Sequence, residues 1–347
     1  METASRPFIP LRAFVCKWKE ETQSEMKLVT FVTGNEDRVG VLKDNLIVDI
    51  GLVIGSLRNN SLGLAQRPEL QEAIKTVLAG GAAPQQMTDL LERGETWRRA
   101  LAEILDALTA NQEPPRLPQS LFAPVEQVRL RAPLLRPGKI VCVGLNYESH
   151  RAEQGIQTPA RPIFFLKSGN TICGPGDAIV LPPNSTQVDY EAEFAVVIGK
   201  RGKHIPQDKV FEHIAGYTIL NDVSARDLQI GDRQWFRGKS CDTFAPIGPC
   251  IVTTDEIPDP HCLRISLTLN GRTMQDSNTN DLIFKIPFLV SYLSQSLTWE
   301  PGDLLSTGTP GGVGHHRKPS IYLQPGDTVS VTVESIGTLT NPVIGPS

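Results

Sequence analysis

Three carboxylates alternate with other residues where an acidic stretch leads into an apolar strand. Asp189-Tyr190-Glu191-Ala192-Glu193 runs directly into Phe194-Ala195-Val196-Val197-Ile198. Because strand side chains alternate between two faces, Asp189, Glu191 and Glu193 share one face, with same-face neighbours about 6.7 Å apart. Such carboxylates repel one another, and a dry interior tolerates them only when a cation neutralises them. The pattern indicates a divalent metal site; the alternative is an exposed edge with solvated acids.

Asp222 is a third candidate ligand. It follows the apolar run Tyr217-Thr218-Ile219-Leu220-Asn221, and a strand can deliver its carboxylate beside Glu191 and Glu193. Three carboxylates without nearby Cys or His describe a site for a hard cation. Mg²⁺ fits best because it retains waters that substrate oxygens can replace, with Mn²⁺ and Ca²⁺ as alternatives. Taken alone, Asp222 could instead be an Asx-type cap, in which its side chain bonds to the backbone just before Ser224.

A candidate general base follows the apolar run 141–144. His150 and Glu153 are three residues apart, so on a helix they face the same way. A carboxylate raises the basicity of a neighbouring imidazole and fixes its tautomer, as activation of water requires. The alternative is an incidental pair on a surface helix. The remaining histidines lack such a partner and are predicted to be surface or loop residues: His204, His213, His261, His315 and His316.

Two further segments could contact a substrate. Arg237-Gly238-Lys239-Ser240 resembles the end of a phosphate loop, but Arg233 stands where that loop needs glycine, which excludes nucleotide binding. Lys239 could present its ammonium to a developing oxyanion, or it could lie on the surface. The glycine-rich segment 307–314 offers backbone N–H groups and the Thr309 hydroxyl to a carboxylate; a simple tight connection is the alternative.

The elements that must position these residues fall into two regions. Residues 26–50 predict short strands, and helices follow near 68–78 and 87–108. The proline-rich segment 111–118 predicts an extended linker. We therefore place a small N-terminal α+β domain at 26–118 and a catalytic domain at 119–347. Turn signals from about residue 128 predict a β-rich sandwich or barrel with short helices near 206–215 and 284–297, a fold that is mostly β overall.

Composition excludes several classes of partner. A net charge of -4 without a basic run provides no field for nucleic acid or an anionic membrane. No apolar run approaches the ~18 residues of a membrane span. Six cysteines without regular spacing predict reduced thiols and a cytoplasmic location. Residues 1–25 are too acidic for a transit peptide, so we expect a disordered extension or an upstream start.

Taken together, these motifs resemble the fumarylacetoacetate hydrolase family, and most of all its domain-containing proteins and bacterial diketoacid hydrolases. The resemblance covers roughly residues 120–343. It rests on these segments, in order: Asn146-Tyr147-x-x-His150-x-x-Glu153, Asp189-Tyr190-Glu191-x-Glu193, Asn221-Asp222-Val223-Ser224-Ala225-Arg226-Asp227, Gly238-Lys239-Ser240 and Thr307-Gly308-Thr309-Pro310-x-Gly312-Val313-Gly314. The additional upstream aspartate ligand and distant glutamate of the larger eukaryotic members have no counterpart, which argues against fumarylacetoacetate itself as the substrate.

The resemblance implies a mixed β-sandwich roll that is usually a homodimer and binds a 2-oxo or dioxo carboxylate. Mg²⁺ or Mn²⁺ would be bound through Glu191, Glu193 and Asp222. A mobile lid would carry His150 and Glu153. The residues implied around the substrate oxygens are Lys239, Arg226, Gln229 and Thr309.

The expected activity is hydrolysis of a C–C bond in an acylpyruvate-type 2,4-dioxo acid. The metal would chelate the 2-oxo-carboxylate, His150 with Glu153 would deprotonate water, and Lys239 would assist at the enolate oxyanion. Alternatives within the family are oxaloacetate decarboxylation and hydration or isomerisation of a 2-oxo acid. Two alternatives lie outside the family. A non-catalytic β-sandwich that binds a metal or ligand is disfavoured because it would need no base. A nicotinamide-dependent oxidoreductase is disfavoured because the sequence lacks the βαβ fingerprint of such enzymes.

Overall fold

A computed structural model describes residues 26–43, 45–109 and 121–346. The extension expected at residues 1–25 and the linker expected at 111–118 lie outside the described residues.

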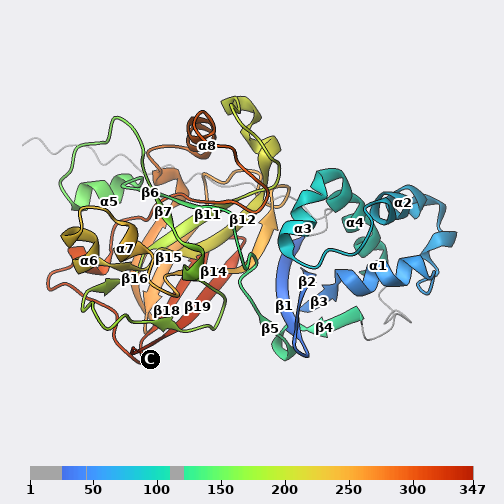
Figure 1. Cartoon of the computed structure of the whole chain (residues 1–347), viewed down its shortest axis with the longest axis horizontal. Coiled ribbons are helices and arrows are strands. Elements are labelled where there is room, and N and C mark those ends of the chain that lie inside the picture. Colours follow the sequence, from blue (N-terminus) through green and yellow to red (C-terminus); the bar gives the residue numbers. More distant parts are fainter. Residues whose placement is uncertain (1–25, 44, 110–120, 347) are drawn as a thin grey trace, which may run out of the picture.

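A large mixed sheet is the framework of the molecule (Figure 1). Its strands are β1 (Lys27–Thr33), β2 (Glu36–Lys43), β3 (Leu46–Asp49), β4 (Phe122–Pro124), β5 (Arg129–Leu130), β6 (Ile140–Gly144), β7 (Ile163–Lys167), β8 (Ile172–Cys173), β11 (Ala192–Ile198), β12 (Ile214–Asn221), β14 (Ala245–Thr253) and β17 (Leu304–Ser306). They are hydrogen-bonded in the order β4-β3-β2-β1-β14-β12-β11-β17-β6-β7, with β5 beside β1 and β8 beside β14.

A second sheet has the order β16-β15-β18-β19-β9, and a short ribbon pairs β10 with β13. The bounds are β9 (Ile179–Val180), β10 (Val188–Asp189), β13 (Ser224–Ala225), β15 (Arg264–Leu269), β16 (Arg272–Asn278), β18 (Thr328–Val333) and β19 (Gly337–Ile344).

The large sheet separates two apolar cores. On β11, Phe194 and Val196 belong to the core shared with the five-stranded sheet, whereas Ala195 and Val197 belong to the core shared with the N-terminal helices. Side chains that alternate between two buried faces produce this division. The predicted β-rich sandwich is therefore confirmed, with an added helical layer on the outer face of its larger sheet.

Helices cover this framework at both ends. The α-helices are α1 (Ile50–Arg58), α2 (Gln71–Ala79), α3 (Met87–Glu92), α4 (Gly94–Thr109), α5 (Glu148–Glu153), α6 (Arg226–Gly231), α7 (Phe236–Lys239) and α8 (Ile286–Ser294). Short 3₁₀ helices span Leu64–Gln66, Pro68–Leu70, Val125–Gln127, Gly169–Thr171, Gln207–His213, Thr279–Asp281 and Gly314–His316. In Figure 1, α5, α6 and α7 gather at the opposite end of the molecule from α1 and α2.

Most predicted helices are confirmed, with two differences. The single helix predicted over 87–108 is two helices because Gly94 has φ of +79°, which an α-helix cannot continue. The segment 206–215 forms the 3₁₀ helix Gln207–His213 instead of an α-helix. The prediction of no membrane span agrees with the described part of the chain, where no helix is long and apolar enough to cross a membrane.

The N-terminal strands continue the sheet that carries the later strands. Lys27 and Leu28 of β1 pair with Val252 and Ile251 of β14 in antiparallel register. Strands from residues 26–49 and from beyond residue 121 thus share one hydrogen-bonded framework.

Candidate active site

Two neighbouring strands bring the three predicted metal ligands together. Ala192 at the start of β11 pairs with Asn221 at the end of β12, so Glu191, Glu193 and Asp222 meet at one edge. One carboxylate oxygen from each lies within 4.8 Å of the others. All three residues are buried, with exposed fractions of 5%, 1% and 0% in that order. The alternative of a solvated, exposed edge is therefore wrong.

Asp189 separates from this cluster because the expected continuous strand is interrupted. β10 ends at Asp189 and β11 begins at Ala192. In the gap, the Glu191 backbone N–H donates to Asn221 Oδ1 (3.0 Å). The Asp189 carboxylate instead accepts the backbone N–H groups of Gly314 (2.8 Å) and His315 (3.0 Å). Asp189 therefore anchors a loop outside the ligand cluster.

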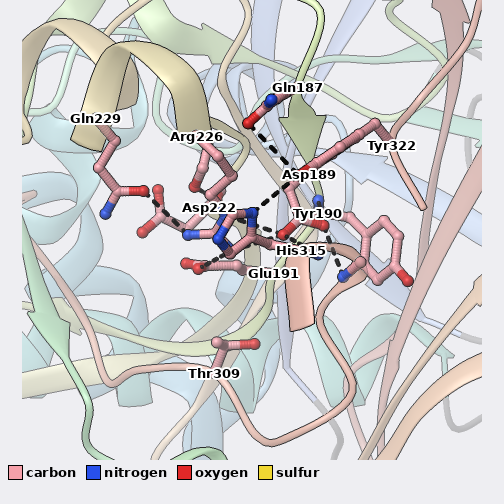
Figure 2. A network of polar contacts seen from close by, with 12 residues as sticks. Gln187, Asp189, Tyr190, Glu191, Asp222, Arg226, Gln229, Thr309, His315 and Tyr322 are labelled. Atoms are coloured by element: carbon pink, nitrogen blue, oxygen red, sulfur yellow. Dashed lines mark hydrogen bonds and ion pairs between the residues drawn. The ribbon is translucent and has the colours of Figure 1, made fainter. Parts of the chain in front are cut away.

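Three cations compensate most of the buried negative charge. Lys239 Nζ lies 2.7 Å from both Glu191 Oε2 and Asp222 Oδ2, and Lys167 Nζ lies 2.5 Å from Asp222 Oδ1. Arg226 joins Glu191 to Asp189, at 2.7 and 2.8 Å (Figure 2). Burial favours a raised pKa for Glu191, but Lys239 and Arg226 outweigh it and hold that pKa well below its ordinary range.

Glu193 is the exception in this charge balance. Its carboxylate accepts the Ser306 hydroxyl and the Gly308 N–H, and forms no ion pair with any described residue. Burial, followed by repulsion from Asp222 and Glu191, raises its pKa well above the ordinary value. A hard divalent cation would supply the missing positive charge, and three carboxylate oxygens suit such an ion. This donor set fits a divalent metal held by Glu191, Glu193 and Asp222.

The predicted His–Glu pair forms on α5. His150 Nδ1 lies 2.7 Å from Glu153 Oε1, and the Gly312 N–H donates to Glu153 Oε2 (2.9 Å). Burial opposes ionisation of Glu153, but its bonds to His150 and Gly312 lower its pKa overall. The ionised carboxylate places the imidazole proton on Nδ1, so Nε2 accepts the Gln154 amide at 2.8 Å. His150 is buried, and its Nε2 lone pair can act as a base once the Gln154 amide no longer donates to it.

The glycine-rich loop binds carboxylates, as its composition suggested, but they belong to the protein itself. Backbone N–H groups of Gly308, Gly312 and Gly314 donate to Glu193, Glu153 and Asp189, respectively. A Cβ at Gly314 would lie 1.9 Å from the Ile321 carbonyl oxygen, so only glycine permits this approach. One loop thus connects the base, the ligand cluster and the Asp189 anchor.

Lys239 is buried because α7 packs tightly on α6. A Cβ at Gly238 would lie 2.6 Å from the Gln229 backbone nitrogen, so the glycine permits this close approach. The Lys239 ammonium also lies 5.0 Å from the centre of the Phe165 ring. The alternative of a surface lysine is wrong.

These elements enclose a cavity of about 260 Å³. Its lining includes the predicted residues His150, Glu191, Glu193, Arg226, Gln229, Lys239 and Thr309. Glu153 and Asp222 are not part of that lining and contact it through His150 and Lys239. Thr309 accepts the Gln275 amide at 2.9 Å, and Arg226 donates to Gln229 at 3.1 Å.

Sequence reasoning missed several residues of the site. His315 and His316 were predicted only to be surface or loop residues, and both line the cavity on the turn after the glycine-rich loop. Their position directly after Gly314 was the available signal. Lys167 was not singled out, although a lysine that ends the apolar strand β7 is an indication of a buried charge. Gln154, beside the base, carried no signal of its own.

Known proteins are similar to this chain in sequence and in fold. The model of the fumarylacetoacetate hydrolase C-terminal family matches residues 139–344. The oxaloacetate tautomerase Fahd2a of Rattus norvegicus is 45% identical over 300 residues, covering 83% of this chain and 92% of its own. The human oxaloacetate tautomerase FAHD2A is 46% identical over 267 residues, covering 75% of this chain and 80% of its own. Both names carry the description mitochondrial.

Two solved structures extend the similarity. Fumarylacetoacetate hydrolase from psychrophilic Exiguobacterium antarcticum has a TM-score of 0.72 and 31% identity, covering 92% of this chain and 99% of its own. The 2-hydroxyhepta-2,4-diene-1,7-dioate isomerase of Mycobacterium marinum has a TM-score of 0.64 and 33% identity. This match covers 92% of the present chain and 98% of the isomerase. The expected family and fold are confirmed: the chain belongs to the fumarylacetoacetate hydrolase family of enzymes.

Proposed function

We propose that the protein is a metal-dependent tautomerase that interconverts the enol and keto forms of oxaloacetate. The carrying observation is one cavity that joins the His150 base to the Glu191/Glu193/Asp222 cluster. Keto–enol exchange needs a base at carbon 3 and, at the 2-oxo oxygen, positive charge and a proton donor. Relatives with 45–46% identity are named oxaloacetate tautomerases, which supports this substrate above an acylpyruvate.

In this mechanism, the Gln154 amide first moves away from His150 Nε2. The freed Nε2 then removes a proton from carbon 3. Glu153 holds the Nδ1 proton and stabilises the imidazolium that forms. Glu191, Glu193 and Asp222 would hold a divalent cation, which would supply positive charge for the enolate oxygen. Lys239 donates a hydrogen bond to that oxygen and transfers a proton to it, which completes the enol. The His150 imidazolium then loses a proton to solvent and Lys239 regains one from solvent. In the reverse direction, His150 returns the proton to carbon 3.

We propose Mg²⁺ as the ion, with Mn²⁺ and Ca²⁺ as alternatives. The donor set contains only oxygen, and Mg²⁺ retains waters that the substrate can replace. Titration calorimetry of metal-free protein with each ion ranks the three ions by their Kd.

The test of the assigned base is His150→Gln, which keeps a polar side chain of similar size but loses the basic nitrogen. We expect kcat for ketonisation of enol-oxaloacetate to fall about 100-fold, while the Kd for Mg²⁺ stays within about twofold. His204→Asn, an exposed histidine outside the cavity, is the control. Unchanged turnover in His150→Gln would overturn the assignment.

Hydrolysis of a C–C bond remains the second candidate. A water placed where Gln154 now donates to His150 would meet the same base. Maleylpyruvate hydrolase from Sphingobium, with a TM-score of 0.69 and 28% identity, supports this alternative. Acetate and pyruvate released from acetylpyruvate would identify hydrolysis, and pyruvate from oxaloacetate would identify decarboxylation.

Assembly and location are also proposals. A homodimer is expected from the resemblance, and light scattering after gel filtration measures it. The described cysteines Cys142, Cys173, Cys241 and Cys250 are free thiols, which fits a reducing compartment. Because the relatives are named mitochondrial, imaging of the full chain should distinguish mitochondria from the cytoplasm that the sequence predicted.

A further inference from the structure

Two further imidazoles, those of His315 and His316, line the cavity that contains the base. The ring centre of His316 lies 5.9 Å from that of His150 and 5.0 Å from that of His315. The His315 backbone N–H donates to Asp189, and Nδ1 of the His315 ring lies 2.9 Å from the Tyr322 hydroxyl (Figure 2). These contacts fix the turn that carries both histidines, so His316 is held near the reacting position.

The other basic groups of the cavity are already engaged. Lys239 lies between two carboxylates of the ligand cluster, and Arg226 donates to two carboxylates and to Gln229. His150 is paired with Glu153, and His315 with a tyrosine. Of the basic residues that line the cavity in the described structure, His316 has no hydrogen bond or ion pair. It can therefore bind a substrate anion without first losing a partner.

We propose that His316 binds the carboxylate at carbon 4 and thereby selects dicarboxylate substrates. This inference rests on the proposed function, because carbon 3 must lie against His150. Carbon 4 is one bond away, so the donor that binds its carboxylate must also stand next to His150. An imidazole retains an N–H donor whether it is neutral or protonated, which lets His316 serve in either state. The chemical class selected is a four-carbon 2-oxo diacid.

The direct test is binding of malate and lactate in the presence of Mg²⁺. The two 2-hydroxy acids differ by the distal carboxylate, and neither is the substrate of the proposed reaction. We expect the wild-type protein to bind malate at least about tenfold more tightly than lactate, as a hydrogen bond to a charged group provides. His316→Leu should bring the ratio of the two Kd values close to one by weakening malate binding alone.

Two further variants separate this role from a structural one. His316→Gln keeps an N–H donor and should retain most of the malate preference. His204→Asn should leave both Kd values unchanged. Because His316 is exposed, its replacement leaves the apolar cores intact. A ratio that is the same in His316→Leu as in the wild type would overturn the inference, as would equal weakening of malate and lactate.

Kinetics distinguish failure of this inference from failure of the proposed function. If the wild-type protein does not accelerate ketonisation of oxaloacetate, the proposed function fails, while the malate-to-lactate ratio still tests His316. If the wild type is active, His316→Leu should lower kcat/KM for enol-oxaloacetate about tenfold. Its kcat/KM for enol-phenylpyruvate, which has one carboxylate, should change less than about twofold. Equal losses on both substrates would contradict a role in selecting diacids.

Discussion

At Glu193, burial and charge oppose ionisation, and this makes the stability of the metal-free protein dependent on pH. Its folded pKa is raised above the ordinary 4.5, so the folded state retains a proton that the unfolded state has released. The associated stability is complete below the ordinary pKa and is lost as pH rises through the raised value. Divalent metal should reverse this loss because it replaces the proton.

We therefore predict that the melting temperature of chelator-treated protein falls as the pH rises from about 5 to about 9, and that Mg²⁺ reduces the fall. Thermal unfolding at several pH values measures both effects. Glu193→Gln should remove the contribution of this residue and weaken Mg²⁺ binding. An unchanged pH slope in Glu193→Gln would show that another group causes the dependence.

Glu153 provides a second prediction at this scale. Glu153→Gln removes the negative charge that stabilises the imidazolium, so kcat should fall about 100-fold while Mg²⁺ binding is retained. Glu148→Gln is the matched control on the same helix, because Glu148 pairs with Arg151 at the surface. Stopped-flow ketonisation assays compare the two. Similar losses in both variants would mean that the helix, and not the dyad, had been disturbed.

Among elements, α5 is connected to the rest of the site by a few polar contacts. Ser149 Oγ donates to Asp281 Oδ2 (2.6 Å), the Ser149 N–H donates to the same oxygen (3.0 Å), and the Gly311 N–H donates to Ser149 Oγ (3.2 Å). Together with the Gly312–Glu153 bond, these contacts hold the base over the ligand cluster. We expect a short helix held in this way to have low local stability.

We predict that Ser149→Ala increases hydrogen exchange across residues 148–154 and lowers kcat/KM about tenfold, because the base is positioned for less of the time. Global melting should change little, since Ser149 is exposed. His204→Asn, an exposed residue outside this helix, is the control. If exchange across the segment did not change, Ser149 would have no part in holding α5.

The sequence predicted what local rules determine. Alternation along 189–198 separated Tyr190, Ala192 and Phe194, all in the core, from the acids, and the spacing of His150 and Glu153 predicted their contact. Contacts between distant segments could not be predicted from the sequence. Lys167 reaches Asp222 from a strand 55 residues earlier, and Asp189 leaves the ligand cluster because β10 pairs with β13. No local pattern encodes either contact.

In the whole molecule, one core joins the N-terminal helices to the catalytic sheet. Leu101 of α4 and Val197 of β11 belong to the same apolar core, and β1 is hydrogen-bonded to β14. Leu101→Ala should lower the free energy of unfolding by about 2–5 kcal/mol. Loss of tryptophan fluorescence and loss of activity in denaturant should still coincide. Two separated transitions would show that the N-terminal region unfolds independently.

The most direct test of the account is the rate at which enol-oxaloacetate ketonises, followed by ultraviolet absorbance with Mg²⁺ and with chelator. The account predicts acceleration that depends on Mg²⁺, is lost in Glu191→Ala, and yields keto-oxaloacetate without pyruvate. Acceleration that persists in chelator and in Glu191→Ala would contradict the role assigned to the carboxylate cluster. Stoichiometric release of pyruvate and carbon dioxide would contradict tautomerisation and identify a decarboxylase.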